Sequence, residues 1–303
     1  MQTPILFLIF NRLDTATKVF ERIREVTPAR LFIAADGPRE QKSGEKEKCE
    51  EVRNTILGMI DWDCELKTFF REENLGCRMA VSSAIDWFFD HVEEGIILED
   101  DCLPSISFFS FCSVLLEKYR NDDRIGIISG DNFLSNKIKI KESYYFSKFP
   151  YIWGWATWKR VWKLYDVDML DWVEVKKNKD FNSRFQGVYA KFYYHAMFDL
   201  AFQRRISTWD YQFLFMNFKH NLINVIPKKN LVKNIGFSKT ATHTKSSSKF
   251  IDINHEELEV IKFNEYVETN YRADKITFNL LIKRNWKNLF FVFGLHKLVK
   301  IKM

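Results

Sequence analysis

The stretch Gly95-Ile96-Ile97-Leu98-Glu99-Asp100-Asp101-Cys102-Leu103-Pro104 decides the fold, because a short apolar run leads directly into three adjacent carboxylates. An apolar run of this length is typical of a strand buried on both faces of a parallel sheet. Open α/β sheets bind their ligands at the carboxyl ends of such strands. Three adjacent acids are costly to desolvate without a cation or hydrogen-bond donors, and their hard oxygen atoms favour Mg²⁺ or Mn²⁺. An isolated acidic triplet is more often a solvated turn, so the surrounding sequence has to decide between these two interpretations.

The first 140 residues alternate between short apolar runs and segments with apolar residues at helical spacing. This alternation predicts parallel βαβ units. Pro104 suits the first turn of a helix that continues to Tyr119. The predicted strands, with helices between them, cover residues 5–10, 31–35, 64–71, 95–99 and 125–129.

The composition excludes several classes of protein. The chain has 303 residues, of which 46% are hydrophobic and 16% aromatic, so it can bury a large core and is not a disordered protein. Its five cysteines are scattered without a CxxC pair, which argues against a disulfide framework or a structural zinc and indicates a reducing cytoplasm. The first ten residues lack a basic segment before their apolar run and are predicted to form a strand, not a signal peptide. No stretch has the roughly 18 consecutive apolar residues of a membrane span.

Basic residues are concentrated near the end of the chain. Residues 272–303 contain eight Lys or Arg and one Asp, interleaved with apolar and aromatic side chains. Such a helix suits the surface of an anionic membrane, but it can equally be a terminal helix docked on the domain. We do not expect nucleic-acid binding, because the charge lies in one stretch and no recognition motif accompanies it.

Polar residues follow four of the predicted strands. They are Asn11 and Arg12, then Asp36, then the acidic triplet 99–101, and finally Asp131. In a parallel sheet all four groups would lie at the same edge. Asp36 can accept hydrogen bonds there, and Arg12 and Arg78 can supply positive charge for phosphates, although a lone arginine is more often part of a surface ion pair.

Two common phosphate-binding motifs are absent. The sequence contains neither GxGxxG nor GxxxxGK[ST], so NAD-dependent hydride transfer and P-loop hydrolysis are poorly supported. The first predicted strand is followed by Asn11-Arg12-Leu13-Asp14 instead of the Gly-rich basic loop expected of a sugar nucleotidyltransferase.

The order strand-Asn-Arg, strand-Asp-Gly, Asn74-Leu75-Gly76-Cys77-Arg78 and strand-Glu-Asp-Asp resembles the nucleotide-sugar-binding half of the GT-A glycosyltransferases. The Glu-Asp-Asp variant is similar to that of the N-acetylglucosaminyltransferase I enzymes. The resemblance covers residues 4–245 and implies an α/β, Rossmann-like GT-A fold, with a mixed, mostly parallel central sheet flanked by helices and a C-terminal helical extension. We expect a GT-A domain over residues 1–250, with a nucleotide-sugar-binding half (1–140) and an acceptor-binding half (141–250), followed by a basic amphipathic helical extension over 251–303.

The resemblance also implies roles for the matched residues. Asp101 would bind Mn²⁺ or Mg²⁺, and Glu99 and Asp100 would contact sugar and ribose hydroxyls. Asp36 would face the base and Arg78 the diphosphate. Asn11 and Arg12 complete the predicted donor-binding set.

The acceptor hydroxyl needs a general base, and Asp210 is the candidate because it lies beside Trp209 at a predicted helix start. It resembles the base of N-acetylglucosaminyltransferase I in this placement, which would imply inversion at the anomeric carbon; the alternatives are a simple helix cap, or Asp199 as the base. His243 would be a second metal ligand, as in many GT-A enzymes, unless it is an exposed loop histidine. Trp153, Gly154 and Trp155 can form a wall against the sugar, or the tryptophans can belong to the core.

These observations lead to one expected function and two alternatives. We expect a metal-dependent, inverting glycosyltransferase that moves a sugar, from a UDP-sugar or another nucleotide-diphosphate sugar, to a hydroxyl of a glycan or lipid-linked glycan in surface polysaccharide synthesis. It would be cytoplasmic, with its tail placing it peripherally on the inner face of the plasma membrane. The alternatives are a non-catalytic GT-A-like scaffold at the membrane surface and a sugar nucleotidyltransferase.

Overall fold

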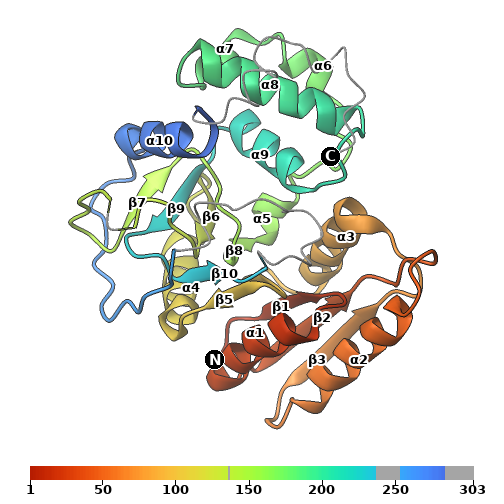
Figure 1. Cartoon of the computed structure of the whole chain (residues 1–303). Coiled ribbons are helices and arrows are strands. Elements are labelled where there is room, and N and C mark those ends of the chain that lie inside the picture. The colour runs from red at the N-terminus through yellow and green to blue at the C-terminus, as the bar shows by residue number, and fades with distance from the viewer. Residues whose placement is uncertain (136, 237–252, 284–303) are drawn as a thin grey trace.

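A mixed sheet of eight strands forms the centre of the computed structural model, which describes residues 1–135, 137–236 and 253–283. The strand order is β3-β2-β1-β4-β8-β6-β9-β7 (Figure 1). Strands β3, β2, β1 and β4 pair in parallel, as do β6 and β9. The strands of this sheet are Ile5–Ile9 (β1), Arg30–Ala35 (β2), Glu65–Phe70 (β3), Glu94–Glu99 (β4), Ile125–Ser129 (β6), Tyr144–Ser147 (β7), Trp155–Trp158 (β8) and Ile223–Pro227 (β9). The predicted α/β architecture, a mostly parallel central sheet with flanking helices, is confirmed.

Strand β8 lies antiparallel between β4 and β6. Because β8 opposes both neighbours, β6 runs in the same direction as β4 and therefore as β1 and β2. The carboxyl ends of β1, β2, β4 and β6 consequently lie at one edge of the sheet, as the sequence predicted. The sheet is also continuous across residue 140, since β8 of the second half pairs with β4 of the first.

Helices lie on both sides of the sheet (Figure 1). Helix α1 contacts α2 and α4, whereas α3 contacts α5 and the strands β1 and β2. A second group, α6 to α9, forms a separate helical layer at the top of Figure 1 with its own aromatic core. The helices are Leu13–Val26 (α1), Glu45–Gly58 (α2), Gly76–His91 (α3), Ile106–Tyr119 (α4), Lys159–Trp162 (α5), Trp172–Val175 (α6), Lys179–Ser183 (α7), Val188–Phe202 (α8), Asp210–Lys219 (α9) and Tyr271–Phe278 (α10), which a π-helical turn at Asn279–Lys283 extends.

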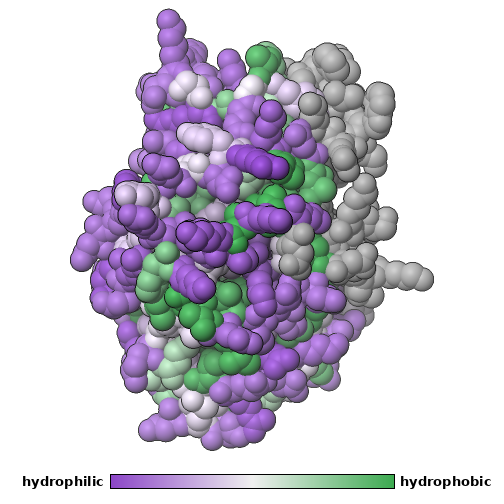
Figure 2. Space-filling model, turned by 90° about the vertical axis from the view of Figure 1, so that its left-hand side faces the viewer, coloured by the Kyte–Doolittle hydropathy of each residue, from purple (hydrophilic) through white to green (hydrophobic). Residues whose placement is uncertain are grey.

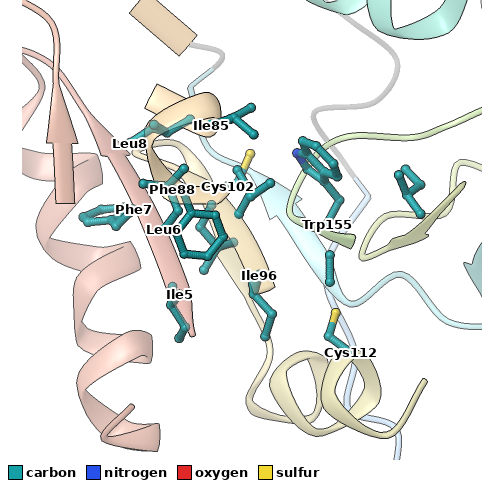
Figure 3. Close-up of a cluster of buried hydrophobic side chains, with 14 of the residues drawn as sticks. Ile5, Leu6, Phe7, Leu8, Ile85, Phe88, Ile96, Cys102, Cys112 and Trp155 are labelled. Carbon is teal, nitrogen blue, oxygen red and sulfur yellow. The ribbon is translucent and has the colours of Figure 1, made fainter. Parts of the chain in front are cut away.

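The main core forms where β1 and β4 are covered by helices on both faces (Figure 3). All five residues of β1 are buried, as expected for a central parallel strand. Phe88 of α3 packs here directly against Gly95 of β4. A Cβ built on Gly95 would lie 2.3 Å from the Phe88 ring, so a side chain at this position would clash with it. Apolar side chains also reach the surface in several groups among hydrophilic ones, on the face at the left of Figure 1 (Figure 2).

The chain after the acidic triplet differs from the prediction. Pro104 does not begin a helix; it ends a short strand, β5 (Cys102–Pro104), and α4 starts at Ile106. Strand β5 pairs antiparallel with β10 (Val232–Asn234). This pairing partner comes from more than 120 residues later in the chain, so no local pattern could indicate it.

The described part of the C-terminal segment is docked on the domain. Phe278 and Ile282 are each 7% exposed and join the aromatic core of the helical layer. Asp274 of α10 accepts hydrogen bonds from the Ser147 hydroxyl (2.6 Å) and the Lys148 backbone N–H (3.0 Å). These contacts favour the docked-helix alternative for residues 271–283. Residues 253–270 of the predicted extension form no helix, and residues 251–252 and 284–303 lie outside the described residues. Within the described ranges, no helix combines the length and the apolar character that crossing a membrane requires.

His195 in the helical layer gives a prediction about stability in acid. Burial lowers its pKa to about 4, and the charges of Lys176 and Lys191 act in the same direction against Asp199. Since the unfolded state takes up the proton near pH 6.5, the stability that neutral His195 provides is present above that pH and is lost as the pH falls towards 4. The free energy of unfolding should fall between pH 7 and pH 4, and in His195→Leu this fall should be smaller by up to about 3 kcal/mol. Urea unfolding of both proteins across this range measures the difference, and parallel stability curves would contradict it.

Candidate active site

A cavity of about 740 Å³ opens at the carboxyl edge of the parallel strands. This volume is within the usual range for a small-molecule site. Seven of the predicted site residues line the cavity: Arg12, Asp36, Glu99, Asp100, Asp101, Trp153 and Asp210. Asn11, Arg78, Gly154 and Trp155 are not among its lining residues. His243 lies outside the described residues.

The guanidinium of Arg12 supplies positive charge to the acidic triplet. One guanidinium nitrogen, Nη2, donates to Asp100 Oδ1 at 2.8 Å and to Asp101 Oδ2 at 3.0 Å. Asp100 also accepts the Phe10 backbone N–H at 3.3 Å. Burial, together with repulsion from the neighbouring carboxylates, nevertheless holds the pKa values of Glu99 and Asp100 above their usual range. A cationic or hydrogen-bonding ligand would therefore stabilise the charged forms of these carboxylates.

Asp36 organises the loop that begins α3. Its Oδ1 accepts the backbone N–H groups of Gly37 and Leu75, each at 2.9 Å. Its Oδ2 accepts the Asn74 amide at 2.8 Å and the Gly76 N–H at 3.0 Å. The carboxylate thus already holds four donors, and it shapes the wall of the cavity whether or not it also faces a base.

Asp210 is the first residue of α9, and its side chain lines the cavity. The Thr208 hydroxyl donates a hydrogen bond to Asp210 Oδ1. Glu99 lines the same cavity, and its pKa is raised mainly by burial, with smaller contributions from the charges of Asp101, Asp100 and Asp210. The competing candidate Asp199 is bound instead to the Trp172 indole N–H at 2.9 Å and to Lys176 in the helical layer.

The aromatic segment contributes only part of the predicted wall. Trp153 lines the cavity, but Trp155 is 1% exposed and stacks on Trp209 in the core, with ring centroids 5.8 Å apart. Trp155 is drawn into the core because it belongs to β8 in the middle of the sheet. Gly154 has a φ of +66°, and a Cβ there would lie 2.9 Å from Val232 Cγ2, so the glycine serves close packing at the start of β8.

Asn11 and Arg78 bind partners that the sequence did not indicate. The Asn11 amide donates to Glu45 at 2.9 Å, and Arg39 is the other partner of that buried acid. Together these donors lower the pKa of Glu45 to about 2. Arg78 pairs with Asp168 at 2.6 Å and with the Val167 carbonyl, and its side chain is only 12% exposed.

Three residues that the sequence did not single out lie against Asp101. The Asn234 amide is 3.5 Å from Asp101 Oδ1, and the Ile235 backbone N–H donates to the Asp101 carbonyl at 2.8 Å. A Cβ built on Gly236 would lie 2.2 Å from Asp101 Oδ2, so a larger residue there would displace the Asp101 carboxylate. The β5–β10 pairing brings this segment to the triplet, and no sequence signal at Asn234-Ile235-Gly236 indicates it.

The donor set can hold a divalent cation only with help from a ligand. Among the residues that the structure describes, no group of three or more His, Cys, Asp or Glu side chains could hold a metal ion. Mg²⁺ is commonly bound by one or two carboxylates together with substrate phosphates, and hard oxygen donors suit Mn²⁺ equally. Asp101, 18% exposed at the side chain and lining the cavity, fits that type of site.

Comparison with known proteins adds only remote likenesses. No protein-family model and no curated protein matches the sequence. HddC from Yersinia pseudotuberculosis is 8% identical, with a TM-score of 0.32 over 52% of this chain and 78% of that one. For 4-diphosphocytidyl-2C-methyl-D-erythritolsynthase from Anaerococcus prevotii the identity is 10%, with a TM-score of 0.31 over 54% and 74% of the two chains. UDP-glucose pyrophosphorylase complexed with UDP-glucose is 10% identical, with a TM-score of 0.35 over 76% and 94%. Structures this distant carry no argument about the function of this chain.

Proposed function

We propose that this protein is a metal-dependent, inverting glycosyltransferase that transfers a sugar from a nucleotide-diphosphate sugar to a hydroxyl of a glycan or lipid-linked glycan. The observation that carries the proposal is one cavity, lined by both the Arg12-bound triplet 99–101 and the carboxylate of Asp210. A site for sugar transfer needs positive charge for the diphosphate and a separate base for the acceptor.

The chemistry follows from these two parts of the cavity. Asp210 accepts the proton of the acceptor hydroxyl as its oxygen bonds to the anomeric carbon of the sugar. The bond between that carbon and the diphosphate oxygen breaks, and its electron pair leaves with the nucleoside diphosphate. A divalent cation at Asp101 would neutralise charge that builds on the diphosphate. Attack opposite the leaving group inverts the anomeric configuration.

A nucleotidyltransferase is the second reaction to be tested. Strand β1 ends at Ile9 and α1 begins at Leu13, so only three residues separate them. This connection is too short to form a glycine-rich loop around a triphosphate, which favours sugar transfer over nucleotidyl transfer.

Ligand-dependent thermal stability tests the proposal. We expect one sugar among the UDP-, GDP-, CMP- and dTDP-linked donors to raise the melting temperature, and to do so more strongly with Mn²⁺. At 100 times its Kd a donor adds about 2.7 kcal/mol to the free energy of unfolding. A UDP-, GDP- or dTDP-sugar that binds should then release its nucleoside diphosphate in the presence of an acceptor, whereas a CMP-sugar would release CMP. Release of pyrophosphate from a nucleoside triphosphate and a sugar phosphate would instead establish the nucleotidyltransferase, and binding without turnover would favour the scaffold.

A further inference from the structure

Arg12 is the cationic side chain that contacts the acidic triplet. Its Nη2 atom lies between Asp100 Oδ1 and Asp101 Oδ2, at 2.8 and 3.0 Å. The three side chains are 25%, 6% and 18% exposed, so the contact is shielded from water and weakly screened by salt. An ion pair of this kind holds its partners more firmly than an exposed one does.

Gly236 also lies against the Asp101 oxygen that Arg12 binds. A Cβ on Gly236 would lie 2.2 Å from Asp101 Oδ2 and 2.8 Å from Arg12 Nη1, so the Gly236 backbone packs directly against the ion pair. Among the residues that the structure describes, the contacts of the other oxygen, Oδ1, are long ones of 3.5 Å, to the Asn234 amide and the Cys102 thiol. With Arg12 in this position, a cation has access to little more than one oxygen of Asp101.

The backbone of Arg12 is held in place at the start of α1, and the residue borders the cavity. Arg12 immediately precedes α1, and its carbonyl accepts the Ala16 N–H at 3.1 Å. Its guanidinium also lines the cavity. A guanidinium binds phosphate oxygens as well as carboxylates, so a diphosphate in the cavity offers Arg12 an alternative partner.

We propose that Arg12 competes with the divalent cation for Asp101, so that the metal binds tightly only when a nucleotide diphosphate draws Arg12 away from this carboxylate. This inference rests on the proposed function and adds an order of binding to it. The coupling is reciprocal: the metal strengthens diphosphate binding by the same factor as the diphosphate strengthens metal binding. The site would then hold little metal until a donor is present.

Binding of Mn²⁺ alone, without nucleotide, tests the competition directly. We expect Arg12→Gln to bind Mn²⁺ at least about tenfold more tightly than the unmodified protein, measured from the free Mn²⁺ signal in electron paramagnetic resonance. Arg71→Gln is the matched control. Arg71 lines the same cavity, but it binds the Ser83 hydroxyl at 2.7 Å and the Phe69 ring, so its removal takes the same charge without freeing an acid. Equal or weaker Mn²⁺ binding by Arg12→Gln, or an equal gain in Arg71→Gln, would overturn the competition.

A second variant guards against loss of the fold in Arg12→Gln. Arg12→Lys keeps the charge but replaces the planar guanidinium by a single ammonium group, which cannot bridge the two carboxylates in the same way. We expect its affinity for Mn²⁺ to lie between those of the unmodified protein and Arg12→Gln. Affinity unchanged from the unmodified protein in both folded variants would also overturn the competition.

UDP distinguishes this inference from the proposed function. In the unmodified protein, UDP should raise Mn²⁺ affinity beyond the amount due to Mn²⁺–UDP complexes in solution. In Arg12→Gln, UDP should raise the Mn²⁺ affinity less. The reduction should match the factor by which this variant binds Mn²⁺ alone more tightly than the unmodified protein does. If Arg12→Gln binds Mn²⁺ more tightly while UDP and the other nucleoside diphosphates bind neither protein, the competition stands and the proposed nucleotide-sugar function fails.

Discussion

Asp210→Asn is expected to lower kcat for sugar transfer by about 10²- to 10⁴-fold, the usual contribution of a general base. The variant keeps the shape of the side chain, and its amide oxygen can still accept the hydrogen bond of the Thr208 hydroxyl. Donor binding should therefore change by less than about threefold, because the base acts on the acceptor and not on the diphosphate. Initial rates at saturating donor, together with the donor Kd from titration, separate the two effects.

Asp199→Asn provides the matched control. Asp199 accepts hydrogen bonds from Trp172 and Lys176 in the helical layer, and it does not line the cavity. The variant should weaken that layer while leaving kcat nearly unchanged. Retention of kcat by Asp210→Asn would remove Asp210 from the mechanism, and a large loss of kcat in a folded Asp199→Asn would restore the competing assignment.

The strand ends of the site could be predicted because their signals are local. Each consists of an apolar run followed at once by polar residues, and a parallel arrangement brings them to one edge without further information. The cluster of Arg12 with the acidic triplet follows from this arrangement. The specific ion pair of Arg12 with Asp100 could not be predicted in this way, because residues 12 and 100 come together only through the register of β1 with β4.

Long-range contacts account for the features that the sequence did not predict. Arg78 is a plausible phosphate ligand by its place at the start of α3, but Asp168, 90 residues later, binds its side chain. No local feature of the sequence distinguishes Trp155 from Trp153. Trp155 is buried because its strand, β8, lies between β4 and β6. Gly236 reaches Asp101 through the β5–β10 pairing. In each case the deciding partner is far away in the sequence.

Asp36→Ala is expected to lower the free energy of unfolding by about 3–5 kcal/mol. Four donors lose a charged acceptor, and each such hydrogen bond is worth about 1.5–3 kcal/mol, but the loop can relax and regain water. This relaxation should recover only part of the loss, because the Glu73 backbone packs against Gly37, where a Cβ would meet the Glu73 carbonyl carbon at 2.4 Å. Urea unfolding measures the change, and Asp61→Ala, which removes an exposed partner of Arg24, should leave stability nearly unaltered.

The same variant separates the two roles considered for Asp36. If the carboxylate only anchors residues 74–76, donor affinity in Asp36→Ala should recover when the loop is restored by other means, such as low temperature or a stabilising osmolyte. If it also binds the base, affinity stays low in the folded variant, and the preference among UDP, GDP, CMP and dTDP donors changes. The four hydrogen bonds already made by Asp36 favour the first outcome, because they leave its oxygen atoms little capacity for another donor. A changed nucleotide preference in a fully folded Asp36→Ala variant would show instead that the loop rearranges so that Asp36 can bind the base.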